Sequence, residues 1–152
     1  MVTLGDKAIF IDTNILIYAN VASAPYHQLA IETLQNLDNS QVELWLSRQI
    51  LREFIATLTR PQMFINVQSP DVIVERVQFF EQVFCITEDS FQVTERLLDL
   101  LLTIPIGGRQ VHDANIVATM LTTGIDQLLT HNVRDFERFS DLITVIPLVA
   151  AT

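Results

Sequence analysis

The sequence has little lysine, cysteine and glycine, and it has no long apolar run. Its 152 residues include one lysine, one cysteine and four glycines. No apolar run approaches the roughly 18 residues that suggest a membrane-spanning helix, so we expect no membrane span. The N-terminal stretch MVTLGDKAIFID lacks the basic and apolar regions of a signal peptide. The lone Cys85, in the apolar run VFCI, is typical of a reduced core residue and favours a cytoplasmic protein.

Positive charge is also scarce in this chain. Nine basic residues stand against eighteen acidic ones, which gives a net charge of −9, and eight of the nine basic residues are arginine. This balance argues against a surface that binds nucleic acid over its whole area, although it leaves a local site open. An acidic surface also suits a basic protein partner.

The apolar residues predict a single α/β domain covering residues 1–152. Hydrophobic residues make up 49% of the chain, which is enough for a packed core at this length. Short continuous apolar runs alternate with longer amphipathic segments, a pattern typical of parallel strands covered by helices on both faces. Strands are expected at 8–11, 43–46, 83–86, 127–130 and 144–146. Helices are expected at 25–37, 47–58, 69–82, 90–102 and 111–123, with a further helix beginning at Thr13 and Asn14 and a loop at 103–110.

The stretch FIDTNILIYAN places Asp12 in the middle of an apolar run. Burial of an unpaired carboxylate is costly, so this charge needs a partner or access to water. Asp12 follows the first predicted strand, and parallel α/β sheets bind ligands outside the carboxyl ends of their strands. A turn or a helix cap is the alternative role for this aspartate.

Three more acidic residues stand on or beside predicted elements. Glu53 lies off the apolar stripe of the helix at 47–58, where it either lines a cleft or is solvated. Asp113 begins a helix after a Gly-Gly loop, where it also complements the helix dipole. Asp135 follows the strand at 127–130, with Asn132 between them, in a segment that also reads as a simple turn. Converging carboxylates repel each other unless a cation neutralises them. Oxygen ligands without a histidine and cysteine cluster favour Mg²⁺ or Mn²⁺ over Zn²⁺.

Four short motifs together resemble the PIN domain family, and in particular its VapC-like toxin ribonucleases. FIDTNILIY is similar to the family's first motif, and SRQILREF to the helix that carries its glutamate. HDANIVA is similar to the third motif, and LTHNVRDF to the fourth. The resemblance covers nearly the whole chain, and the set and order of the motifs are more specific than any one of them.

The resemblance implies a three-layer α/β/α sandwich with a central, mainly parallel sheet. It implies a metal-dependent endoribonuclease that uses Mg²⁺ or Mn²⁺, with Asp12, Glu53 and Asp113 as carboxylate ligands. Asp135 and Asn132 share the fourth position, because family members differ in which of the two faces the metal. The resemblance also implies a homodimer and a small antitoxin partner.

Other residues are expected to support this site. Thr13 and Asn14 would orient Asp12, as groups beside a metal ligand often do. Four arginines are candidates for contacts with RNA phosphates, although each is equally well explained as a solvated charge: Arg48, Arg52, Arg109 and Arg134.

Three other functions account for the same sequence less well. A receiver domain or a haloacid-dehalogenase-type phosphatase also places an aspartate after a strand, but both need a lysine late in the chain, and Lys7 is the only lysine. A metal phosphohydrolase of the HD type needs more histidines than His27, His112 and His131 provide. A PIN-like scaffold that binds RNA or protein without cleavage is the third alternative, and metal binding would distinguish it from an enzyme.

Overall fold

A five-stranded, entirely parallel sheet forms the centre of the protein. The computed structural model describes residues 7–61 and 66–150, so residues 1–6 of the N-terminal stretch discussed above lie outside it. The strands follow the order β3-β2-β1-β4-β5 across the sheet. Their bounds are Ala8–Ile11 for β1, Glu43–Ser47 for β2, Cys85–Thr87 for β3, Gln127–Thr130 for β4 and Thr144–Pro147 for β5.

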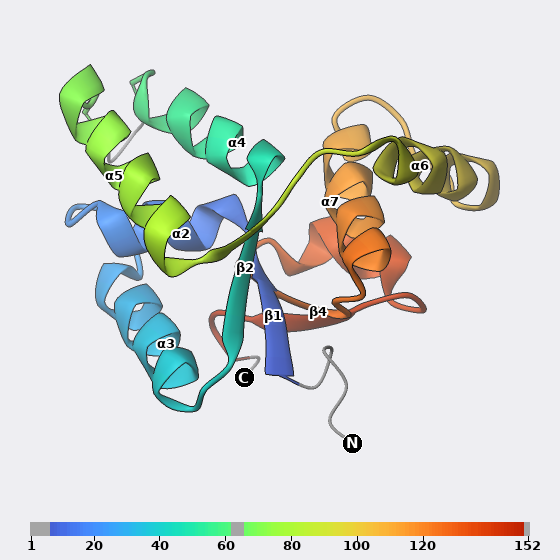
Figure 1. The fold of residues 1–152 in the computed structure, drawn as a ribbon, viewed down its shortest axis with the longest axis horizontal. Coiled ribbons are helices and arrows are strands. Elements are labelled where there is room, and N and C mark those ends of the chain that lie inside the picture. Colours follow the sequence, from blue (N-terminus) through green and yellow to red (C-terminus); the bar gives the residue numbers. More distant parts are fainter. Residues whose placement is uncertain (1–6, 62–65, 151–152) are drawn as a thin grey trace.

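Helices cover both faces of this sheet, as Figure 1 shows. The first group, on one side, consists of α2 (Thr13–Asn20), α3 (His27–Asn39), α4 (Arg48–Leu58) and α5 (Pro70–Val83). The second group, on the other side, contains α6 (Phe91–Thr103) and α7 (Gln110–Thr123). A 3-10 helix, η1 (Val133–Phe139), joins β4 to β5 and packs against α7. The predicted three-layer α/β/α sandwich is therefore confirmed.

The predicted boundaries of helices and strands agree with the structure to within two residues, and the start of the third strand shows the largest shift among the strands. The third strand does not begin at residue 83, because α5 extends to Val83 and the Phe84 N–H still bonds to the Phe80 carbonyl. Apolar helix ends and apolar strands look alike in sequence, which explains this error. Residues 133–139 form η1 rather than the simple turn that an Asn/Asp pair suggests.

The core lies on both faces of the sheet and explains why the strands read as continuous apolar runs. All four residues of β1 are buried, as the central strand of a parallel sheet requires. On α4, Ile50, Phe54 and Leu58 are buried at helical spacing, and the Phe54 ring meets the Phe80 ring edge-on at 4.9 Å. The sequence pattern also places Ile55 in this apolar stripe, but its side chain is 38% exposed.

The strand order places a topological switch point between β1 and β4. The chain runs outward from β1 through β2 to β3, then crosses to the other side of β1 to form β4 and β5. Ligands of parallel α/β proteins bind at such a point, outside the carboxyl ends of the strands. Asp12 follows β1 at this edge, and His131 follows β4. Within the described residues, no helix is both long and apolar enough to cross a membrane.

Candidate active site

Asp12 is the most buried of the four acidic residues, with 6% of its surface exposed. Its Oδ1 accepts a hydrogen bond from the Thr13 N–H at 2.8 Å, which makes Asp12 the N-cap of α2. Its Oδ2 accepts bonds from the Thr130 hydroxyl at 2.8 Å and from the Asn14 amide at 3.1 Å. Burial nevertheless raises the pKa of Asp12 to about 6, because these bonds only partly offset the loss of water. Asp12 is therefore both a helix cap and a carboxylate held in place by donors from the start of α2 and the end of β4.

Glu53 reaches the same region from α4. This helix begins after Ser47, whose hydroxyl accepts a bond from the Ile50 N–H at 3.2 Å. The Glu53 Oε2 accepts a hydrogen bond from the Thr13 hydroxyl at 2.8 Å, and its Oε1 accepts one from the Gln49 amide at 3.0 Å. Glu53 is half-buried and bound at both oxygens, so it is not a freely solvated surface residue.

Asp113 enters from the first turn of α7, which lies on the other face of the sheet from α4. Its pKa is raised to about 7, chiefly by burial. The negative charges of Asp135, Asp12 and Glu53 raise it further. The positive charge of Arg138 acts in the opposite direction. Among the described residues, no hydrogen-bond donor reaches the Asp113 carboxyl group, so this group is open to a ligand.

The two candidates for the predicted fourth position, Asn132 and Asp135, follow β4. Asn132 lines the cleft, and its N–H donates to the Thr130 hydroxyl at 3.0 Å. Asp135 lies in the first turn of η1 and is exposed. Its negative charge is nevertheless one of the three that raise the pKa of Asp113. Asn132 and Asp135 thus lie in the same short segment after β4, close in sequence to each other.

These elements enclose a cleft of about 390 Å³ above the carboxyl ends of β1 and β4. Three of the four predicted carboxylates line it, together with the predicted Thr13, Asn14 and Asn132. The full lining is Asp12, Thr13, Asn14, Ile17, Tyr18, Glu53, Ala56, Thr57, Arg60, Asp113 and Asn132. Residues from four separate segments of the chain therefore meet at one site.

The donor atoms in the cleft suit a hard divalent cation. The acidic side chains offer oxygen alone, which is the ligand type that Mg²⁺ and Mn²⁺ prefer. Within residues 7–61 and 66–150, no three acidic, histidine or cysteine side chains are already arranged to hold an ion together. Mg²⁺ in phosphate-processing sites typically uses one or two carboxylates, with water and substrate oxygens completing its shell. The residues present fit that kind of open site rather than a closed protein cage.

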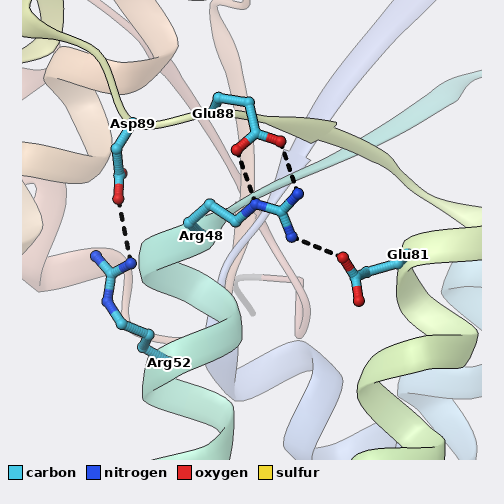
Figure 2. Close-up of polar contacts among 5 residues, drawn as sticks. All are labelled: Arg48, Arg52, Glu81, Glu88 and Asp89. Carbon is cyan, nitrogen blue, oxygen red and sulfur yellow. Dashed lines mark hydrogen bonds and ion pairs between the residues drawn. The ribbon is translucent and has the colours of Figure 1, made fainter.

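The predicted arginines lie in different surroundings, as Figure 2 shows for two of them. Arg48 pairs with Glu88 through two hydrogen bonds of 2.9 and 2.6 Å and with Glu81 at 2.7 Å. Arg52 pairs with Asp89 at 3.1 Å. These pairs connect α4 to α5 and to the segment after β3. Neither arginine lines the cleft.

Arg109 and Arg134 are exposed at the start of α7 and within η1. Their role in RNA binding stays a prediction, as it does for Arg48 and Arg52.

Several residues that shape the cleft were not singled out as site residues from the sequence. Thr130 joins Asp12 to Asn132, and the Gln49 amide joins Glu53 to the His112 carbonyl at 2.9 Å. Gln49 stands four residues before Glu53 on a helix, so the i, i+4 spacing was the available signal. Arg60 lines the cleft from just beyond α4.

Arg138 is a second basic residue near the acidic group. Its Nη1 donates to the Pro105 carbonyl at 3.0 Å, which ties η1 to the loop before α7. Its Nε is buried without a hydrogen-bond partner among the described residues. Its charge lowers the pKa of Asp113, so it partly balances the negative charges around that residue.

The fold and the cleft together define a three-layer parallel α/β protein with acidic side chains gathered at the switch point of its sheet. The chain belongs to the PIN domain family, whose sequence model matches residues 9–142. This confirms the resemblance inferred from the four motifs, and it places the chain in a family of nucleases. No curated protein sequence gives a significant match.

Solved structures share this fold at low sequence identity. VapBC2 from Rickettsia felis, bound to a promoter DNA fragment, matches with a TM-score of 0.65 and 19% identity over 92% of this chain and 98% of that one. A toxin–antitoxin complex from Klebsiella pneumoniae matches with a TM-score of 0.64 and 21% identity over 94% and 99%. The sarcin-ricin loop cleaving toxin VapC20 from Mycobacterium tuberculosis matches with a TM-score of 0.60 and 20% identity over 79% and 86%.

Proposed function

We propose that the protein is a metal-dependent endoribonuclease and the toxin of a type II toxin–antitoxin pair. The observation that carries this proposal is the convergence of three acidic side chains on one cleft: Asp12 after β1, Glu53 on α4 and Asp113 on α7. Asn132, from the β4–η1 segment, lines the same cleft. The pKa of Asp113 is raised to about 7 in the absence of a cation, so the group as a whole resists full ionisation. A bound divalent cation would favour the ionised form of these carboxylates. The chain also belongs to the PIN domain family, which is a family of nucleases.

Asp12 and Asp113 would hold Mg²⁺ or Mn²⁺, with Glu53 and either Asp135 or Asn132 completing the site. When bound, such an ion activates water and neutralises charge on a phosphodiester during hydrolysis. The number of ions, one or two, follows from how many of these carboxylates take part.

The chain's own residues fix the geometry on which hydrolysis depends. Thr130 and Asn14 hold Oδ2 of Asp12, while Thr13 connects Asp12 to Glu53. Fixed carboxylates need little rearrangement when a ligand arrives, which favours tight and correctly oriented binding. Thr13 and Asn14 therefore act as positioning residues in this proposal.

Basic residues around the cleft would contact RNA phosphates. Arg60 lines the cleft and forms no ion pair among the described residues, so it extends the predicted set. Arg109 and Arg134 are exposed at the starts of α7 and η1. Arg48 and Arg52 would join them if RNA displaces their glutamate and aspartate partners.

A basic antitoxin, a homodimeric state and a cytoplasmic location complete the proposal. Toxin–antitoxin complexes among the similar structures support the antitoxin. The net charge of −9 favours a basic partner. Exposed apolar residues on α5, such as Phe79 and Val83, offer a surface for a partner chain.

The test is cleavage of total bacterial RNA by the purified protein with Mn²⁺, followed by sequencing of new 5′ ends. We expect discrete new ends that disappear with EDTA and in the Asp12→Asn and Asp113→Asn variants. Asp141→Asn is the matched control, because this exposed aspartate lies before β5, at the opposite edge of the sheet. Full activity in a clean preparation of Asp113→Asn would rule out this mechanism.

A catalytically inactive PIN-like binding module is the alternative function. Calorimetry with Mn²⁺ distinguishes the two. An active site should bind Mn²⁺ and lose that binding in Asp12→Asn. A protein without Mn²⁺ affinity and without new RNA ends would be the binding module.

A further inference from the structure

Three aromatic rings gather at one end of the cleft. The Tyr26 and His131 rings lie 4.9 Å apart at an interplanar angle of 48°. The Tyr18 ring meets His131 edge-on at 5.6 Å and Tyr26 at 6.1 Å. Tyr18 also lines the acidic cleft itself. The cluster is therefore continuous with the candidate active site.

The cluster is only partly covered by the rest of the protein. Tyr26 keeps 45% of its surface exposed after its contacts with the other two rings. Tyr18 and His131 are half-buried. Burial and the nearby Tyr26 raise the pKa of Tyr18.

The backbone holds the Tyr26 ring in place at some conformational cost. Tyr26 has a φ of 59°, a left-handed conformation that non-glycine residues rarely adopt. It is the N-cap of α3 but provides no side-chain cap bond, so helix capping does not explain the choice of tyrosine. The adjacent His27 is tied to the Tyr18 carbonyl through a 2.6 Å hydrogen bond. Strained conformations of this kind often occur in functional segments.

Hydrogen bonds connect the rings to the residues that fix Asp12. The His131 N–H donates to Asn14 Oδ1 at 3.0 Å, and the Asn14 amide donates to Asp12 Oδ2. Asn132, the next residue, lines the cleft. A ligand bound on the rings would thus have a defined position relative to the carboxylates.

We propose that Tyr26, His131 and Tyr18 form a subsite that stacks an unpaired RNA base beside the phosphodiester bond cleaved at the acidic cleft. Aromatic side chains bind single-stranded RNA by stacking on splayed bases, which a duplex does not offer. This inference rests on the proposed ribonuclease function and specifies its substrate as single-stranded at the cleavage site.

The charge of the protein strengthens the case for stacking. With a net charge of −9 and an acidic cleft, the chain attracts phosphates weakly outside a few arginines. Stacking does not depend on the charge of the protein surface, and every base has an aromatic face. Rings at the mouth of the cleft would therefore supply affinity that the surface charge does not.

The experiment uses an oligoribonucleotide that spans a mapped cleavage site, with 2-aminopurine placed at successive positions. Binding to the Asp113→Asn protein should quench the fluorescence at one position next to the scissile bond. Tyr26→Leu in the same background should remove the quench, whereas Tyr26→Phe should keep it. Phe91→Leu is the control, because Phe91 is an exposed aromatic residue on α6, 69% exposed.

Kinetics provide the second readout, in proteins with an intact Asp113. Tyr26→Leu should raise KM roughly ten-fold, in line with the loss of one stacked base, and leave kcat nearly unchanged. Tyr26→Phe should behave as the wild type. If Tyr26→Leu does not fold, His131→Leu replaces it, since its peptide N–H still reaches Asn14.

The outcomes separate the two proposals. Cleavage by the wild type with an unchanged KM and an unchanged quench in folded Tyr26→Leu and His131→Leu would overturn the stacking subsite alone. Absence of RNA cleavage by the wild type would overturn the ribonuclease function and the subsite with it.

Discussion

The Thr130 hydroxyl donates a 2.8 Å hydrogen bond to Oδ2 of Asp12, although the two residues are 118 positions apart in the chain. Thr130 ends β4 and Asp12 follows β1, so the bond closes the switch point of the sheet. The same hydroxyl accepts a hydrogen bond from the Asn132 N–H. Thr130 therefore holds Asp12 and Asn132, which both line the cleft, in fixed positions relative to each other. Thr130 is fully buried, which protects both bonds from water.

Replacing Thr130 with valine should weaken metal binding without disrupting the fold. Valine keeps the branched shape of threonine but has no hydroxyl. In the wild type, the Thr130 hydroxyl lowers the pKa of Asp12 and orients its carboxyl group. Loss of a group that orients a metal ligand typically costs about 10- to 100-fold in affinity or activity. Calorimetry with Mn²⁺ and the RNA cleavage rate measure this loss. Thr122→Val, at an exposed site on α7, is the control, and equal Mn²⁺ affinities for the two variants would contradict the role of Thr130.

The fold was largely predictable from the sequence because its pattern is local. The central strands β1 and β4 appear as apolar runs bounded by polar residues, and both were predicted at their observed bounds. The start of α4 was predictable because Ser47 is a good cap, and it does accept the Ile50 N–H. Where an apolar helix end runs into an apolar strand, as at Val83, the sequence does not mark the boundary.

The site was less predictable, because its supporting residues gain their roles only through the fold. Asp12 and Asp113 stand out as charges beside apolar runs or Gly-rich loops. Thr130 is an ordinary strand residue by composition, and only the pairing of β1 with β4 brings it to Asp12. Arg60 follows α4, and its place in the cleft depends on the direction of that helix. Contacts of this kind join residues that are far apart in the chain, so the spacing of residues along the sequence does not predict them.

Replacing Gln49 with leucine should destabilise the protein and reduce activity together. The Gln49 amide donates to Glu53 and to the His112 carbonyl, and it accepts from the Asn115 amide at 2.8 Å. Leucine removes all three hydrogen bonds from this partly buried region, and a buried polar group that is left unpaired costs about 1–3 kcal/mol of unfolding free energy. Urea unfolding measures this cost. Gln92→Leu, at an exposed site on α6, should cause little change, and an equal loss there would contradict the bridging role.

The metal-free protein should lose stability as the pH rises from about 4 to 7. The pKa values of Asp12 and Asp113 in the folded protein are about 6 and 7, above the ordinary value of 3.8. Between about pH 4 and pH 7 the folded state binds more protons than the unfolded state, so the free energy of unfolding falls as the pH increases. Each pKa unit corresponds to about 1.4 kcal/mol for a fully buried group, and to less for the half-buried Asp113.

Urea midpoints at pH 5 and pH 7.5 in EDTA measure this pH dependence. The urea midpoint of Asp113→Asn should fall less between pH 5 and pH 7.5 than that of the wild type, because asparagine does not titrate. Asp141→Asn should retain the wild-type drop. Added Mn²⁺ should bind more tightly at pH 7.5 than at pH 5, since the ion requires ionised ligands. The same drop in the wild type and Asp113→Asn would show that Asp113 does not carry the effect.

Replacing Arg60 with glutamine should weaken RNA binding in a salt-dependent way. Arg60 lines the cleft without an ion-pair partner among the described residues, so its charge is free to meet a phosphate. Loss of one phosphate contact to single-stranded RNA should reduce the slope of log K against log salt by about 0.7. Binding to the inactive Asp113→Asn protein at several salt concentrations measures this slope.

The comparison variant is Arg48→Gln, which changes the same kind of charge outside the cleft. Arg48 is held by Glu81 and Glu88, and these partners raise the pKa of its guanidinium and neutralise its charge locally. We therefore expect Arg48→Gln to leave the salt slope unchanged. An equal reduction in both variants would mean that RNA opens the Arg48 ion pairs, and that the binding surface extends from the cleft along α4 to the segment after β3. A change in neither would place the phosphate contacts on Arg109 and Arg134 instead.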